Sequence, residues 1–284
     1  MILIVGTKDD LTIKYFQKYL TQNMRLFVFL NQNNIGIEYH LDLDGIHYNN
    51  GLFIAFSSIT GVFNRARDLN PRYKYPKKLY SNLGLLFYIL DTTFNNVVNR
   101  SDTTGSNISK PYQLRFYKRK NIKIPKSTIL ANTIPLGFHE STIYKSTSSE
   151  RSIVKEINPV DSLRQVTCPV LFQKNICGTN IRAHVVGKEV FSLAITSDTI
   201  DYRYSKNKTR FEEVELPSSI SRECADITKQ NNFLFSGIDL IKTTRGYYFL
   251  EANPSPGYHY FEKHMNEKKI SFALMNILAK RSIK

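Results

Sequence analysis

Apolar and polar positions in the first third of the chain alternate between two periods. Short apolar runs such as ILIVG are typical of buried strands, whereas apolar residues three or four positions apart are typical of amphipathic helices. Strand, helix and strand follow one another from the second residue, which predicts a small α/β unit. We expect strands over residues 2–6, 25–30, 52–56, 61–64 and 96–99, and helices over residues 11–20 and 78–94.

A polar stretch, RSDTTGSNISKP, interrupts this pattern after residue 99. Gly, Pro and small polar residues in a row are typical of a connection, so we place a boundary near Ser106. The chain beyond it is rich in strand-like runs. We expect strands over residues 142–145, 169–176, 181–186, 189–195, 237–243 and 247–252, and helices over residues 218–230 and 268–280.

The composition is that of a folded protein, since 42% of its 284 residues are hydrophobic and 22% are charged. No apolar run reaches the roughly 18 residues of a membrane-spanning helix, and the first residues lack a basic segment, so we expect a soluble, cytoplasmic protein. Three scattered cysteines fit a reducing compartment. The net charge of +15 is compatible with an anionic partner, such as nucleic acid, a membrane surface, nucleotide phosphates or an acidic peptide, and charge alone does not choose among them.

The segment GIDLIKTTRGYYFLEANPSPG contains two strand-like runs joined by a short turn, which predicts a hairpin. If the turn centres near Arg245, Asp239 lies opposite Glu251, at a separation of about 4.5 to 5.5 Å. Two carboxylates repel there unless a cation or a proton lies between them. Asn253 shares the face of Glu251. This oxygen set suits Mg²⁺ held together with phosphates, and we favour it over a solvated polar face.

With this hairpin, the run CPVLFQKNICGTNIRAHVVGKEVFSLAITSDTIDYRY resembles the ATP-grasp superfamily, whose signature is an acid on one strand and Glu-x-Asn on the next. It is most similar to the glutathione-synthetase and ribosomal-protein glutamate-ligase (RimK-like) branch, and there to peptide-modifying ligases of the microviridin or graspetide type. The resemblance covers about residues 99–262.

The resemblance implies an α+β ATP-grasp fold, in which two lobes grip ATP, after a small α/β pre-ATP-grasp domain. The implied N-terminal domain spans residues 1–105 and the ATP-grasp domain residues 106–284. Within the latter, the central lobe spans about residues 106–172 and the C-terminal lobe about residues 173–284.

The resemblance also implies roles for single residues in nucleotide binding. Lys110 and Lys145 occupy positions where the family places phosphate-binding lysines, and a compact ammonium suits that task, although a solvated surface lysine is the default for either one alone. Gln173, Lys174 and Ile176 fall on the hinge that reads adenine, for which a buried strand is the alternative.

Arg182 and Arg203 resemble positions that contact the phosphates or the acyl phosphate, and we expect them to act in catalysis. Metal binding is implied for Asp239, Glu251 and Asn253. For His184, on the same strand face as Arg182, we favour a structural hydrogen bond.

Two segments depart from the family pattern. The loop 146–152 contains no glycine where many relatives have a glycine-rich phosphate loop, although its amides and hydroxyls, with Ser152 and Arg151, could still cradle an anion. After the hinge, Asn180 stands where an acid often meets the ribose.

The implied activity is an ADP-forming, ATP- and Mg²⁺-dependent ligation, with Mn²⁺ as an alternative metal. ATP phosphorylates a carboxylate, and an amine or hydroxyl attacks the acyl phosphate to give an amide or ester. An acidic peptide substrate would also account for the positive charge. Tyr258 and Tyr260 either line the acceptor pocket or are packing aromatics. Because the family often forms dimers, a homodimer is a further expectation.

Two other functions stay open. The basic run RFYKRKNIKIPK and the pI of 9.6 are compatible with a nucleic-acid-binding protein, although a solvated face near a strand explains such a run more simply. The absence of glycines from the loop 146–152 is compatible with a pseudo-enzyme that binds nucleotide and acts as a scaffold.

Overall fold

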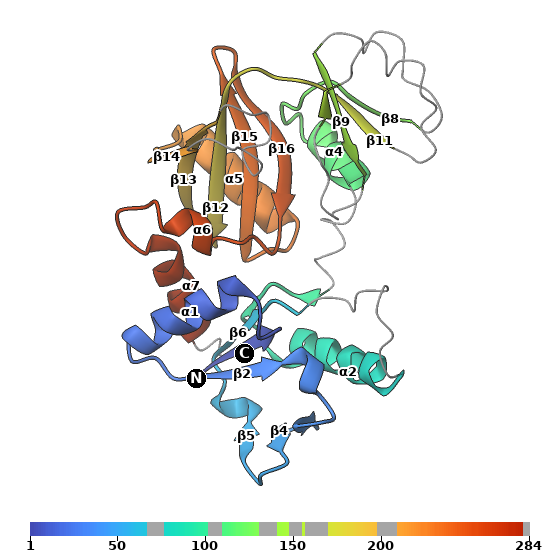
Figure 1. Cartoon of the computed structure of the whole chain (residues 1–284), viewed down its shortest axis with the longest axis vertical. Helices are drawn as coiled ribbons and strands as arrows, with labels where there is room; N and C mark the ends of the chain where they lie inside the picture. The colour runs from blue at the N-terminus through green and yellow to red at the C-terminus, as the bar shows by residue number, and fades with distance from the viewer. Residues whose placement is uncertain are drawn as a thin grey trace. The chain divides into compact units, whose positions relative to one another are not determined.

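The protein is described from a computed structural model, which defines residues 1–66, 77–101, 110–130, 141–147, 155–156, 170–197 and 209–280. Contacts divide the chain into two units, one of residues 1–104, 232–235 and 255–284 and one of residues 105–231 and 236–254. Figure 1 shows the elements of each. The domain division at residues 105 and 106 stays a prediction. By contacts, residues 255–284 group with the N-terminal unit, whereas the sequence assigned them to the ATP-grasp domain.

The N-terminal unit is built on a four-stranded sheet in the order β2, β1, β6, β7, with every pair parallel. All five residues of β1 are buried, as expected for a parallel strand covered on both faces. The predicted α/β character is therefore confirmed. The strands are β1 (Ile2–Gly6), β2 (Phe27–Asn31), β6 (Gly61–Asn64) and β7 (Val97–Val98).

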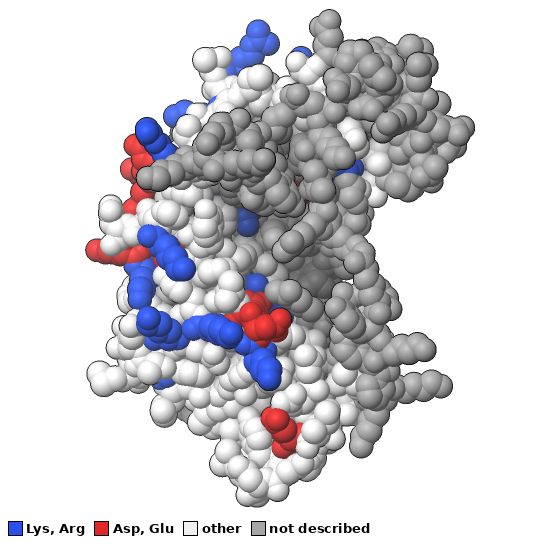
Figure 2. Space-filling model, in the orientation of Figure 1, with Lys and Arg blue, Asp and Glu red and all other residues white. Residues whose placement is uncertain are grey.

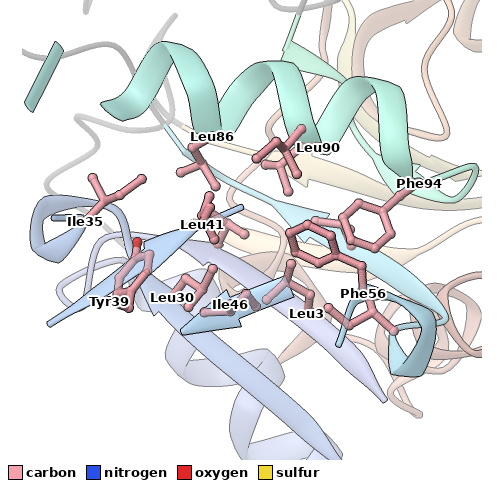
Figure 3. Packing of buried hydrophobic residues seen from close by; sticks show 14 of the residues in the cluster. Leu3, Leu30, Ile35, Tyr39, Leu41, Ile46, Phe56, Leu86, Leu90 and Phe94 are labelled. Carbon is pink, nitrogen blue, oxygen red and sulfur yellow. The ribbon is translucent and has the colours of Figure 1, made fainter. Parts of the chain in front are cut away.

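Helix α2 (Lys77–Thr93) packs against this sheet through one apolar face. Figure 3 shows Leu86 and Leu90 of the helix above Leu3 and Leu30 of the strands. All four side chains are buried, and burial of each contributes about 1.5 to 3 kcal/mol to the stability of the fold. The helix predicted at residues 78–94 is confirmed to within one residue at each end.

The helices α1 (Leu11–Gln22) and α7 (Lys269–Ala279) also contribute to the core of this unit. The Phe16 ring of α1 packs edge-on against Phe63 of β6, at 4.9 Å between centroids. A Cβ on Gly61 would lie 2.6 Å from the carbonyl oxygen of Leu278. Glycine therefore permits α7 to pack closely against β6, which is why the C-terminal helix belongs to this unit.

Two buried side chains attach distant segments to the N-terminal unit. The Asn99 amide oxygen accepts from the backbone N–H of Leu234 and Phe235, and its Nδ2 donates to the Phe235 carbonyl. Arg65 donates to the Asp10 carboxylate at 2.8 Å and to the Pro256 carbonyl at 3.1 Å. Asp10 is also the N-cap of α1, so one carboxylate serves the helix and the ion pair.

Residues 32–58 form elements that the sequence pattern mostly did not predict. They comprise two 3₁₀ turns (Gln32–Asn34 and Phe56–Ser58) and a three-stranded antiparallel sheet of β3 (Tyr39–Leu41), β4 (Gly45–Tyr48) and β5 (Phe53–Ala55). Only β5 falls within a predicted range, residues 52–56. These strands are too short for their periodicity to stand out from the surrounding turns.

The second unit contains two sheets. One has the order β10, β9, β11, β8 and the other the order β14, β13, β12, β15, β16. The first comprises β8 (Ser127–Leu130), β9 (Thr142–Ser146), β10 (Lys155–Glu156) and β11 (Val170–Lys174). The second comprises β12 (Thr179–Val186), β13 (Glu189–Thr196), β14 (Arg210–Glu213), β15 (Phe235–Thr243) and β16 (Gly246–Asn253).

Helix α5 (Ser218–Gln230) covers one face of the five-stranded sheet. Cys224 and Ile227 of this helix pack with Ala183 of β12 and with Ile238 and Leu240 of β15. The alternation of β12 places Ile181, Ala183 and Val185 in this core. The opposite face of the sheet consequently carries Arg182 and His184.

Helix α4 (Lys110–Arg119) was not predicted. It occupies the end of the polar linker and the start of the basic run at residues 115–126, whose remainder leads into β8. Gln113, Leu114 and Tyr117 are buried on one side of this helix, so the run is not simply a solvated face. Among the described residues, no helix is both long and apolar enough to cross a membrane.

Candidate functional site

The candidate site lies on the hairpin of β15 and β16. Thr243 pairs with Gly246, so Thr244 and Arg245 form a two-residue turn, and Gly246 has φ of +104°. Asp239 pairs with Glu251, which confirms the predicted pairing. Leu240, however, pairs with Phe249, so Leu250 is an extra residue on β16. A β-bulge, in addition to the turn, places the two acids opposite each other.

The bulge also decides which side chains share a face. Phe249 and Ala252 belong to the core beneath α5, with Leu240 and Ile238 as their partners. In a regular strand Phe249 would share its face with Glu251, two positions away. Because of the extra residue, Glu251 lies opposite Asp239 on the face away from α5 instead. Asn253, paired with Gly237, lies on that same face.

Arg182 lies beside the acids. Its Nη1 donates to Asp239 Oδ1 at 2.7 Å, and the side chains are 7% and 23% exposed, respectively. A guanidinium this close partly offsets the repulsion between Asp239 and Glu251. Arg182 is thus one cation that this acid pair requires, and its predicted contact with phosphate stays a prediction.

His184 lies two residues beyond Arg182 on β12 and is fully buried. Burial, and secondarily the charge of Arg182, holds the pKa of His184 well below its usual range. The imidazole is therefore neutral at physiological pH, and the structural hydrogen bond favoured from the sequence stays a prediction.

The donor set of the hairpin fits a magnesium ion. Two carboxylates and one carboxamide are hard oxygen donors, and Mg²⁺ usually takes one or two carboxylates together with substrate phosphates and water. No group of three or more His, Cys, Asp or Glu residues that could hold a metal occurs in the described parts of the chain. The three residues are therefore a partial site, which phosphate oxygens would complete. Their role as metal ligands stays a prediction.

The two predicted phosphate lysines are in the same unit as the hairpin. Lys110 is the first residue of α4, and its backbone N–H donates to the Thr147 carbonyl at 3.3 Å. Lys145 is on β9, where it pairs with Leu171 of β11, and is 8% exposed. Lysine is rarely buried to this extent unless it contacts a group of opposite charge or a polar group.

The predicted hinge connects β11 to β12. Gln173 is buried, and its amide donates to Ser127 Oγ at 3.0 Å, so its side chain supports the sheet. Lys174 is exposed and Ile176 is partly buried, as is Asn180 at the start of β12. A Cβ on Gly178 would lie 2.3 Å from the Lys242 carbonyl oxygen, so the hinge passes close to β15.

The two predicted substrate tyrosines belong to the N-terminal unit. Tyr258 is completely buried, its hydroxyl lies 3.1 Å from Ser271 Oγ, and its ring packs edge-on against Phe235. This matches the packing alternative. Tyr260 is 47% exposed on α6 (His259–Glu262). Three other predicted site residues, Arg151, Ser152 and Arg203, lie outside the described residues.

A cavity of about 620 Å³ lies elsewhere on the second unit. Its lining includes Ile181, Leu216 and Tyr247, which also border the core beneath α5. The cavity is therefore on the face of the sheet opposite Arg182 and Asp239, and the two sites are distinct.

Comparisons with solved structures identify the fold of the chain. Three solved structures match almost the whole chain at low sequence identity. The first is the ATP-grasp ligase PsnB complexed with a phosphomimetic variant of minimal precursor, Mg and ADP, with 20% identity, a TM-score of 0.80 and 98% of both chains covered. The second is the Chryseobacterium gregarium RiPP-associated ATP-grasp ligase in complex with ADP and a leader and core peptide, with 18% identity, a TM-score of 0.80 and 99% of both chains covered. The third is the macrocyclase MdnC from Microcystis aeruginosa MRC bound with precursor peptide MdnA, with 20% identity, a TM-score of 0.79 and 98% of both chains covered.

The chain therefore has the ATP-grasp fold, as predicted. Residues 139–278 match the RimK-like ATP-grasp domain. The superfamily and branch predicted from the sequence are confirmed, and the predicted enzyme class, an ATP-grasp ligase, agrees with both comparisons. No curated protein sequence matches the chain.

Proposed function

We propose that the protein is an ATP- and Mg²⁺-dependent ligase that modifies a peptide by forming an amide or ester through an acyl phosphate. The observation that carries this proposal is the convergence of Asp239, Glu251 and Asn253 on one face of an ATP-grasp sheet, with Arg182 bonded to Asp239. Solved structures of the same fold contain Mg and ADP or precursor peptides, which supports a divalent metal, ATP and a peptide as ligands.

The hairpin residues would hold Mg²⁺, which would supply charge neutralisation for the phosphates of ATP. Arg182 fixes one oxygen of Asp239 at 2.7 Å and so limits the orientations of this carboxylate. Lys110, Lys145 and Arg203 are the further cations that we assign to the phosphates. Because phosphoryl transfer depends mainly on positioning and charge stabilisation, no covalent nucleophile on the protein is required.

The finer assignments are part of the same proposal. We assign adenine recognition to the hinge at Gln173, Lys174 and Ile176, and ribose contact to Asn180. The loop containing Arg151 and Ser152 is assigned to the phosphates. Mn²⁺ as an alternative metal and a homodimer stay predictions.

The experiment measures ADP release with Mg²⁺, ATP and a pool of synthetic peptides rich in Glu, Asp, Thr and Lys. We expect peptide-dependent ADP release together with the loss of one water per bond in the peptide mass. Asp239→Asn and Glu251→Gln should each lower kcat/KM by about 100-fold or more. Glu189→Gln, an exposed acid on β13 of the same sheet, is the matched control and should leave kcat/KM unchanged.

Two outcomes would contradict the proposal. ADP release that the hairpin substitutions leave intact would place the chemistry elsewhere. Stabilisation by Mg²⁺ and ATP without any peptide product, across peptides of varied sequence, would favour the pseudo-enzyme. At 100 times its Kd, bound nucleotide should stabilise the fold by about 2.7 kcal/mol, which a melting experiment detects.

The nucleic-acid alternative is less well supported. On the face shown in Figure 2, the described Lys and Arg side chains are interspersed with Asp and Glu. Phosphate-backbone binding would instead favour a continuous basic surface and steep salt dependence. Salt-sensitive binding of random oligonucleotides that survives Asp239→Asn and Glu251→Gln would revive this alternative.

A further inference from the structure

Among the strands that the structure describes, β16 is the last one of its sheet, so one of its edges pairs with β15 and the other faces no described strand. Backbone N–H and C=O groups on the other edge need partners where they are buried. Two such partners come from the segment that contains α4. The Phe249 N–H donates to the Lys123 carbonyl at 2.8 Å, and Ala252 is bonded to the side chain of Gln113.

The Gln113 amide takes the place of a neighbouring strand at Ala252. Its Nε2 donates to the Ala252 carbonyl at 2.8 Å, and its Oε1 accepts from the Ala252 N–H at 3.1 Å. Gln113 is only 6% exposed, so water does not readily replace these bonds. Ala252 is the middle residue of the Glu-x-Asn motif, between Glu251 and Asn253.

The two anchors bracket the bulge. Phe249 lies just before the extra residue Leu250, and Ala252 lies just after Glu251. The anchors therefore hold the irregular part of β16 from the edge opposite β15. A bulge disrupts the ladder locally and leaves its extra residue unpaired, so added bonds on the free edge fix the strand where pairing is weakest.

Helix α4 itself is fixed against the strand. Tyr117, one helical turn after Gln113, is buried in the same core as Phe249, with ring centroids 6.3 Å apart. Burial raises the pKa of Tyr117, as expected for a hydroxyl in this core. Gln113 is thus presented by a packed helix and not by a mobile loop.

From these contacts we infer that Gln113 is a positioning residue, which orients Glu251 and Asn253 for metal and nucleotide by holding the backbone of Ala252 between them. The inference rests on the proposed function of these two residues as metal ligands. Displacements of about 1 Å at such ligands can lower rates by as much as 100-fold.

The test uses Gln113→Met, which keeps the size of the side chain and removes both hydrogen bonds. We expect the Mg²⁺ concentration for half-maximal ADP release to rise by about 10-fold, and kcat to fall between about 10-fold and 100-fold. The matched control is Thr228→Val, which removes a buried hydroxyl that contacts Ser236 Oγ at 2.7 Å in the same unit. It should lower thermal stability without changing the Mg²⁺ dependence.

Equal losses of stability in the two variants, with the Mg²⁺ dependence unchanged in both, would overturn the inference. If Gln113→Met does not fold, Gln113→Glu is the second variant. It retains an oxygen that accepts from the Ala252 N–H and replaces the amide that donates to the Ala252 carbonyl with a carboxylate oxygen. A wild-type Mg²⁺ dependence in that variant would equally overturn the inference.

Hydrogen exchange separates this inference from the proposed function. The Ala252 amide should exchange faster in Gln113→Met than in the wild-type chain, whether or not the chain is an active ligase. Unchanged exchange would refute the positioning role. A wild-type chain with neither Mg²⁺-dependent nucleotide binding nor turnover would instead refute the proposed function.

Discussion

The ion pair between Arg182 and Asp239 leads to a prediction with an unusual sign. Replacing Arg182 by Met removes the 2.7 Å bond and leaves Asp239 opposite Glu251 without that neighbouring guanidinium. Replacing Asp239 by Asn in this background then removes the repulsion between the two acids. We therefore expect the second substitution to restore part of the stability that the first one removes.

The magnitude follows from the geometry. A hydrogen bond to a charged group contributes about 1.5 to 3 kcal/mol, which sets the cost of Arg182→Met. Two carboxylates about 5 Å apart repel by roughly 3 kcal/mol at an effective dielectric constant near 20. Because Asp239 is 23% exposed, solvent screening reduces this term. We expect Asp239→Asn to recover about 1 to 2 kcal/mol in the Arg182→Met background.

Urea denaturation at pH 7 with a chelator present, followed by circular dichroism, measures these differences. The chain has no Trp, so intrinsic tryptophan fluorescence is not available as a probe. The control is Glu189→Gln in the Arg182→Met background, which should recover nothing. If the double variant with Asp239→Asn is less stable than Arg182→Met alone, the acids do not repel one another as we infer.

Two further predictions concern titratable groups. Because the pKa of His184 is lower in the folded chain, the unfolded chain binds this proton first as pH falls below about 6.5, and stability is lost from that pH downward. His184→Gln should therefore make the urea midpoint less dependent on pH between about pH 6.5 and pH 5. A pH dependence equal to that of the wild-type chain would show that the imidazole is not held neutral. Burial raises the pKa of the Cys224 thiol to about 12, whereas Cys177 is exposed. Alkylation should therefore label Cys177 and spare Cys224 until the protein unfolds, as peptide mapping would detect. Rapid labelling of Cys224 in the native protein would contradict this prediction.

Local pattern was sufficient for much of the fold. The strands at residues 2–6 and 61–64 are recovered with the predicted bounds, because continuous apolar runs mark parallel strands that are buried on both faces. Helix α4 was concealed for the opposite reason. It begins within a polar linker and buries only Gln113, Leu114 and Tyr117, too few positions for a clear helical period.

The pairing of Asp239 with Glu251 was predicted correctly, but the β-bulge that produces it was not predicted. A regular hairpin whose turn centres on Arg245 would pair Asp239 with Glu251. The structure has a two-residue turn at Thr244 and Arg245, and the pairing depends on the extra residue Leu250. A bulge has no sequence signature here, since no glycine marks it, and regular alternation would have assigned Phe249 and Glu251 to one face.

The acid pair has a cation of the protein beside it, the Arg182 guanidinium. From the sequence, two opposed carboxylates required some cation, and Mg²⁺ was the natural candidate. The structure supplies Arg182, which came from a strand more than fifty residues away and which the sequence assigned to phosphate instead. Charge balance alone therefore no longer demands a metal. The proposal of Mg²⁺ now rests on two features, the presence of Asn253 on the same face as the acids and the ATP-grasp fold that contains the hairpin. A purely structural ion pair would require neither the Asn nor this fold.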